Sequence, residues 1–172
     1  MKKFLLPLLL LIAFGFENVF ATFVPTNLFG DKSIAAPHFL FIVLLFIVVY
    51  YNATNGILYG MLFGFIVDIV YSELLGMYLF AFPILAYLVS NAMKILQVNL
   101  FIVSSLVLIS VGILEYYTYG LLLLLGRTNL SASAFFTDRF LPTLLLNGIF
   151  LVIFCFPLRK YILRIFAAVE EM

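Results

Sequence analysis

Long apolar runs separated by short polar breaks dominate the sequence. The breaks carry turn-forming residues, as in the Asn-Ala-Thr-Asn-Gly stretch at 52–56 and the Gly-Arg-Thr-Asn stretch at 126–129. A bilayer core about 30 Å thick takes roughly 20 helical residues to cross. We therefore predict an all-α polytopic membrane protein, with residues 1–172 forming a single integral membrane domain built as a six-helix transmembrane bundle. The helices are expected at Phe4–Val24, His38–Tyr51, Asn55–Tyr71, Gly76–Met93, Asn99–Leu125 and Phe136–Pro157, of which the second is short.

The first run leaves an alternative with five helices. Its basic start at Lys2 and Lys3, followed by leucines, is typical of a secretory signal peptide, and Val19-Phe20-Ala21 is an acceptable cleavage site. The apolar segment nevertheless continues to Val24, which is long enough to span a membrane. We expect residues 1–21 to be retained.

Composition supports the membrane assignment and narrows the chemistry. Apolar residues make up 66% of the 172 residues and charged residues 10%, whereas soluble domains have roughly 45–50% and about 25%. The formal net charge of +1 comes from scattered residues, which argues against a nucleic-acid partner. Cys155 and His38 are the only cysteine and the only histidine, so we expect no metal site, cofactor or catalytic triad, and an interfacial structural role for His38.

The distribution of lysine and arginine predicts the orientation. With the N-terminus inside, six of these residues fall on the inner side and three on the outer side, which places both termini in the cytoplasm. The inner residues are Lys2, Lys3, Lys94, Arg159, Lys160 and Arg164, and the outer residues are Lys32, Arg127 and Arg139.

Residues 158–172 are predicted to form a cytoplasmic amphipathic tail. Arg159, Lys160 and Arg164 occupy one face, and the opposite face is apolar. The apolar residues are Leu158, Tyr161, Ile162, Ile165, Phe166 and Val169. This pattern favours a helix lying on anionic lipid, with a docking segment for a cytoplasmic partner as the alternative.

Glycine recurs at every fourth position in the third apolar run. Gly56, Gly60 and Gly64 fall on one stripe of a helix, and Asp68 completes the row. Small residues let two membrane helices approach closely and gain van der Waals contact. We expect this stripe, with Gly76 at the next helix entrance, to pack another helix of the same chain or, as the second possibility, a partner protein.

Three carboxylates interrupt the apolar runs: Glu17, Asp68 and Glu115. An unpaired charge at such depth costs several kcal/mol, so each is a functional-site candidate. Counting 1.5 Å per residue places all three in the outer half of the bundle, near the expected depth of Arg139. We predict that at least one carboxylate pairs with Arg139, with Asp68 the first candidate. The alternative is that one or two of the three face interfacial water. Polar residues expected to bond across helices are Asn18, Ser90, Asn91, Thr143 and Asn147.

One segment resembles a known family. The stretch from Gly56 to Phe80, with its spaced glycines, Asp68 and the Leu-Gly-Met-Tyr entry at 75–78, resembles the signature of the MreD rod shape-determining membrane proteins. The Met-Lys-Lys start with Glu17, the Leu-Glu-Tyr run at 114–116 and the Asp-Arg-Phe-Leu-Pro run at 138–142 resemble Bacillus-type members, across nearly the whole length.

The resemblance implies a non-catalytic membrane scaffold of the bacterial cell-wall elongation machinery. The expected partners are MreC most directly, with the MreB filament, RodA and a class B penicillin-binding protein in the same complex, in contact with membrane lipid of the plasma membrane.

The family's bundle is similar to the substrate-binding subunits of energy-coupling-factor transporters, so a vitamin-binding transport subunit is the alternative function. Those subunits dock through an alanine row, and here the comparable row Ala13, Glu17, Ala21 has a carboxylate in its middle. A third possibility is an intramembrane hydrolase that uses Asp68 and Glu115.

Overall fold

The described residues are helical along most of their length. The computed structural model describes residues 4–23, 33–71 and 74–170. The first five helices are α1 (Leu5–Phe23), α2 (Phe39–Tyr50), α3 (Ala53–Tyr71), α4 (Met77–Ala92) and α5 (Leu100–Leu124). The short helix α6 (Ala132–Phe135), the π-helical turn η2 (Phe136–Phe140) and α7 (Leu141–Glu170) follow one another without a break. The all-α prediction and the positions of the first five helices are thereby confirmed.

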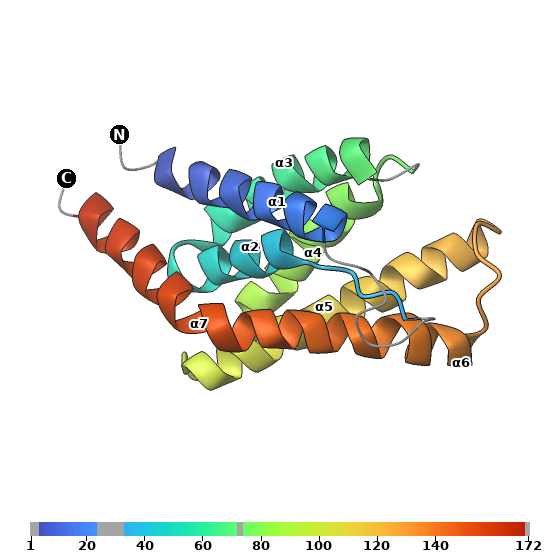
Figure 1. The fold of residues 1–172 in the computed structure, drawn as a ribbon. Helices are drawn as coiled ribbons and strands as arrows, with labels where there is room; N and C mark the ends of the chain where they lie inside the picture. The colour runs from blue at the N-terminus through green and yellow to red at the C-terminus, as the bar shows by residue number, and fades with distance from the viewer. Residues whose placement is uncertain (1–3, 24–32, 72–73, 171–172) are drawn as a thin grey trace.

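Helix α2 is the centre of the bundle. It contacts α1, α3, α4, α5 and α7, and every residue in it except Val49 is buried. A helix that is apolar on all sides is stable when other helices surround it, which is the position α2 takes between α1 and α7 in Figure 1. The core of the protein is therefore built around the second apolar run.

The helices fall into two groups by length when the continuous helix formed by α6, η2 and α7 is counted as one. Among the described residues, four helices are long and apolar enough to cross a membrane: Leu5–Phe23, Ala53–Tyr71, Leu100–Leu124 and the continuous rod Ala132–Ala168. The helices α2 and α4 have 12 and 16 residues, or about 18 and 24 Å at 1.5 Å per residue. The predicted six-helix bundle thus has four long helices and two short apolar ones, and the short second helix agrees with its prediction.

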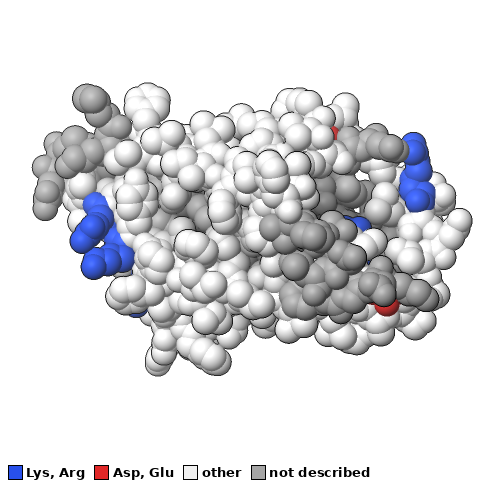
Figure 2. Space-filling model, in the orientation of Figure 1, with Lys and Arg blue, Asp and Glu red and all other residues white. Residues whose placement is uncertain are grey.

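The outer surface has the distribution of charge that a bilayer requires. On the face shown in Figure 2, the larger groups of lysine and arginine atoms lie near the two ends of the molecule. Large apolar side chains such as Leu11, Ile69 and Val152 are more than half exposed. In this protein their exposure marks contact with lipid.

The glycine stripe of α3 packs within the chain. A Cβ atom added to Gly64 would lie 2.5 Å from the carbonyl oxygen of Tyr78, and one added to Gly60 would lie 3.3 Å from the backbone nitrogen of Pro83. Gly56 faces Val48 of α2 in the same way. These three glycines let the backbone of α3 approach α2 and α4, so the packing interpretation of the stripe accounts for all three.

We expect Gly64→Ala to destabilise the protein strongly, because the added methyl meets backbone atoms of α4 that cannot rotate away. The matched control is Gly15→Ala in α1, where nothing lies within 4 Å of the added atom. Alanine should stabilise this partly buried α1 position by up to about 1 kcal/mol, because nothing opposes the added methyl. Unfolding of both variants in detergent measures the difference, and equal stability of the two would contradict close packing at Gly64.

The C-terminal tail differs from its prediction. Residues 158–170 continue α7 as one helix with Pro157 in its interior, and the end of α7 turns away from its first part in Figure 1. Ile162 and Ile165 are buried in the chain's own core, and the Phe166 ring meets Tyr51 edge to face at 5.9 Å. The inner part of the apolar face thus packs on the bundle, where we had expected contact with lipid. The side chain of Val169 lies outside the described part.

Candidate functional site

A non-helical stretch of backbone lies inside the bundle just before α2. Residues 33–38 run beside α7, and Ser33, Ala35 and His38 are buried. In Figure 1 this segment follows α7 before it enters α2. Irregular backbone at membrane depth is tolerated only where protein groups satisfy its N–H and C=O groups. The surrounding side chains must therefore supply hydrogen bonds to residues 33–38.

Helix α7 and the π-helical turn supply these bonds. The Ile34 N–H donates to the Asp138 carbonyl at 2.6 Å, and the Ala36 N–H donates to Thr143 Oγ1 at 3.1 Å. Asn147 uses both ends of its amide: Oδ1 accepts from the His38 N–H at 2.8 Å, and Nδ2 donates to the Ala36 carbonyl at 2.9 Å. Thr143 and Asn147 thus satisfy neighbours within the bundle, as predicted, although these neighbours lie in the non-helical segment before α2.

Glu17 reaches from α1 to the beginning of α2. The Leu40 N–H donates to Glu17 Oε2 at 2.9 Å, and the carboxyl is buried. The first N–H groups of a helix have no partner within it, and negative charge is favoured there. Glu17 therefore stabilises the start of α2, whose N-cap His38 makes no side-chain capping bond.

Asp68 of α3 accepts hydrogen bonds from the backbone at the start of α4. Its Oδ2 accepts from the N–H groups of Gly76 and Leu79, and Oδ1 accepts from that of Tyr78, each at 2.9 Å. The side chain is completely buried. Gly76 has a φ of 105°, a conformation that favours glycine and that turns the chain into α4 beside this carboxylate. Asp68 is thus a helix cap contributed by a neighbouring helix, and Arg139 has a different partner.

Glu115 is the carboxylate that pairs with Arg139. Arg139 Nε donates to Glu115 Oε2 at 2.9 Å, and His38 Nε2 lies 2.7 Å from Oε1. Glu115 is fully buried in α5, and Arg139 lies on the π-helical turn η2. The two contacts of Glu115 join α5 to η2 and to the N-terminus of α2. The expected pairing of a carboxylate with Arg139 is therefore present.

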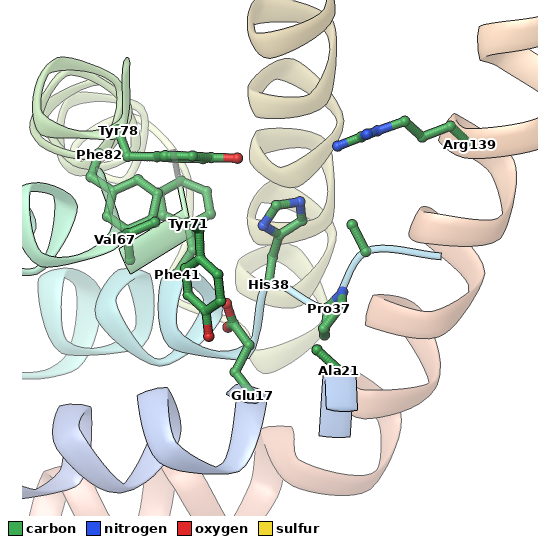
Figure 3. A pocket seen from close by; sticks show the side chains of 11 residues that line it. Glu17, Ala21, Pro37, His38, Phe41, Val67, Tyr71, Tyr78, Phe82 and Arg139 are labelled. Carbon is green, nitrogen blue, oxygen red and sulfur yellow. The ribbon is translucent and has the colours of Figure 1, made fainter. Parts of the chain in front are cut away.

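A cavity of about 170 Å³ adjoins these groups. In Figure 3 the tips of Tyr78 and Arg139 point toward one another across it, with His38 between them and Glu17 on the other side. The remaining walls are largely apolar and aromatic, including Phe41, Val67 and Phe82. In the described part of the chain, no three His, Cys, Asp or Glu side chains gather as metal ligands. The polar groups here therefore form an ion-pair and capping network.

The structure brings together some predicted residues and separates others. Glu17, Glu115 and Arg139 surround the entrance of α2, whereas Asp68 serves the entrance of α4. The alternative that one or two carboxylates face interfacial water is wrong, because all three are buried. His38 has the structural role expected of it, but it is buried beside Glu115, where an interfacial position was predicted. The feature of the sequence that could have indicated a buried His38 is its position as the single histidine, directly before a 12-residue apolar helix.

The basic tail residues have two different environments. The Arg159 guanidinium lies over the Tyr50 ring, 5.6 Å from its centroid, whereas Lys160 and Arg164 are exposed. Three cations used for the orientation, Lys2, Lys3 and Lys32, lie outside the described residues.

Comparison with known proteins gives a consistent result. Residues 2–165 match the family model "rod shape-determining protein MreD". The Rod shape-determining protein MreD of Bacillus subtilis (strain 168) is 36% identical over 165 residues, which are 96% of each chain. The Cell shape-determining protein MreD of Streptococcus pneumoniae (strain ATCC BAA-255 / R6) is 25% identical over 159 residues, covering 92% of this chain and 93% of that one.

No solved structure matches this chain. The expected likeness to energy-coupling-factor transporter subunits therefore stays a prediction.

Proposed function

The chain belongs to the MreD family of rod shape-determining proteins, and from this premise we propose that it works as a membrane scaffold that holds partner proteins in register. The family is a non-enzymatic part of the cell elongation machinery. A scaffold needs a rigid bundle more than it needs a reactive centre.

One observation carries this proposal. Each intramembrane carboxylate takes part in holding the chain together: Glu17 and Asp68 cap α2 and α4, and Glu115 pairs with Arg139 and His38. A hydrolase built on Asp68 and Glu115 would need both carboxylates directed at one substrate, and here they have separate partners. The buried polar groups therefore support a role in stabilising the bundle, as a scaffold requires.

We propose that six crossings are completed by the short helices. The extended segment at 33–38 lengthens the second crossing, and α4 begins below the outer surface at the Asp68 cap. Both ends of the chain and the α4–α5 connection, which carries Lys94, lie at one end of the bundle in Figure 1. An excess of lysine and arginine at that end supports cytoplasmic termini.

A pair of single-cysteine variants tests this orientation. In a Cys155→Ser background, Asn129→Cys should react with a membrane-impermeant maleimide in intact cells, because residue 129 is exposed in the α5–α6 connection. Residue 160 is also exposed, and Lys160→Cys should react only after the membrane is opened. The reverse labelling pattern would invert the proposed topology.

We propose MreC as the direct partner, with MreB, RodA and a class B penicillin-binding protein in the same complex. The exposed cations Lys160 and Arg164 at the cytoplasmic end are the proposed contact for the MreB filament. Arg159 is excluded from this contact, because it packs on Tyr50.

Co-purification tests the scaffold proposal. The tagged wild-type chain should capture MreC and MreB from solubilised membranes, and Lys160→Glu with Arg164→Glu should reduce MreB capture several-fold without lowering stability, because both side chains are exposed. The control is Lys94→Glu, a charge reversal in the α4–α5 connection. Failure of the wild-type chain to capture either protein would contradict the scaffold, and an equal loss with Lys94→Glu would contradict a tail-specific contact.

A further inference from the structure

The cavity shown in Figure 3 has a volume of about 170 Å³, which the capping and ion-pair network does not account for. Protein interiors are close-packed and contain few spaces larger than a water molecule, so a cavity of this size calls for a functional explanation. For comparison, an engineered apolar cavity of about 150 Å³ in another protein takes up benzene. The cavity in this protein is thus large enough for one six-membered ring with a small substituent.

One wall of the cavity is aromatic. The Phe41 and Phe82 rings stack with their centroids 4.8 Å apart, and the Tyr78 ring meets Phe82 edge to face at 5.5 Å. All three side chains line the cavity, together with Tyr71 at the end of α3. Aromatic rings pair through stacked and edge-to-face contacts, which stabilise a complex beyond the effect of the buried area. This wall therefore favours an aromatic ligand over a flexible acyl chain.

The charged groups at the cavity already have partners within the chain. Arg139 donates to Glu115 at 2.9 Å, and His38 lies 2.7 Å from the other oxygen of that carboxylate. Glu17 accepts from the Leu40 N–H at 2.9 Å. An ionic ligand would have to compete with these contacts and would also lose its hydration. A neutral ligand meets neither cost, so the cavity favours an uncharged molecule.

The Tyr78 hydroxyl gives the cavity a polar end. In Figure 3 the tip of Tyr78 points across the cavity toward Arg139, with His38 between them. A phenolic hydroxyl can both donate and accept a hydrogen bond, and a pure hydrocarbon that covered it would satisfy neither. A ring that carries one hydroxyl or N–H group would fill the apolar part of the cavity and also bond to Tyr78.

We propose that this cavity binds a neutral ligand built on one aromatic ring with a hydroxyl or N–H substituent. The ring packs against the aromatic wall, and the substituent bonds to the Tyr78 hydroxyl. Two lining residues, Ala21 and Tyr71, are exposed, so the ligand enters between the ends of α1 and α3. This binding is separate from the scaffold contacts proposed above, which lie on the C-terminal part of α7.

Fluorine NMR of the purified full-length chain in a neutral maltoside detergent tests the proposal. The probe 4-fluorophenol should bind saturably at one molecule per chain, above the unsaturable partition measured in protein-free micelles. The probe 4-fluorotoluene has the same ring without the hydroxyl, and it should bind about fivefold more weakly, the loss expected for one hydrogen bond. Cyclohexanol has the hydroxyl without the aromatic ring, and it should displace 4-fluorophenol less effectively than phenol does.

Two valines of α3 provide a matched pair of variants. Val67→Phe fills the cavity and keeps the polar groups of its wall, so it should abolish 4-fluorophenol binding. Val70→Phe adds the same ring at a position that is 53% exposed, and it should leave binding unchanged. Tyr78→Phe keeps the aromatic wall and removes the hydroxyl, so it should weaken binding of 4-fluorophenol about fivefold and leave that of 4-fluorotoluene unchanged. This last readout holds even if Val67→Phe does not fold.

Three results would overturn the proposal. One is the absence of saturable 4-fluorophenol binding by the wild-type chain. Another is undiminished binding by Val67→Phe, because the probe would then lie elsewhere. The third is a lack of selectivity: equal affinity for 4-fluorophenol and 4-fluorotoluene, equal displacement by cyclohexanol and phenol, or no effect of Tyr78→Phe.

Discussion

Asp68→Ala is expected to lower the free energy of unfolding by about 3 kcal/mol or more, because three backbone N–H groups at the start of α4 lose their acceptor in a buried site. Asp68→Asn keeps one acceptor oxygen but loses the charge and the second oxygen, so its cost should be intermediate. Denaturant unfolding in detergent micelles gives these values.

The control for Asp68 is Asp138→Ala. The Asp138 carboxylate accepts an exposed bond from the neighbouring Thr137 hydroxyl, so its removal should cost less than about 1 kcal/mol. If Asp68→Ala were as mild as Asp138→Ala, the cap would not stabilise α4.

The second large effect is expected at the buried ion pair. Arg139→Met leaves Glu115 charged and fully buried, so we expect a loss of about 3–5 kcal/mol. Glu115→Gln combined with Arg139→Met should recover much of this loss, because no uncompensated charge is left. Stability of the two single variants and the double variant gives the coupling energy directly.

A second double variant makes this test specific. Asp68→Asn combined with Arg139→Met should give nearly additive losses, since Asp68 bonds to the α4 backbone whereas Arg139 bonds to Glu115. Rescue by Asp68→Asn, or no rescue by Glu115→Gln, would contradict the assigned pairing.

Helix positions were predictable because apolar runs and polar breaks alternate along the chain. Turn residues such as Asn52 and Gly126 bound the helices α2 and α5 closely. The prediction that the last helix ends at Pro157 is wrong, because Pro157 is accommodated within α7. A proline can be tolerated in a membrane helix when neighbouring groups compensate for the missing hydrogen bond.

The site was predictable in its residue types but not in its pairing. An intramembrane carboxylate must have a partner, and this identifies Glu17, Asp68 and Glu115 from the sequence. Depth along a helix does not tell which direction a side chain faces, so Asp68 was the first candidate for Arg139 when Glu115 is the partner. Backbone N–H groups at the starts of α2 and α4 leave no mark in a sequence, and they take up two of the three carboxylates.

The bonds between residues 33–38 and α7 also have a consequence for folding during synthesis, because their two sides are far apart in the chain. Ala36 and His38 bond to Thr143 and Asn147, which the ribosome adds more than 100 residues later. Until α7 has entered the membrane, a nascent chain holds α2 beside unsatisfied backbone groups, which membrane insertion disfavours. Helix α7 thus completes the surroundings of α2, and a chain that stops before α7 lacks the groups that satisfy the backbone of residues 36 and 38.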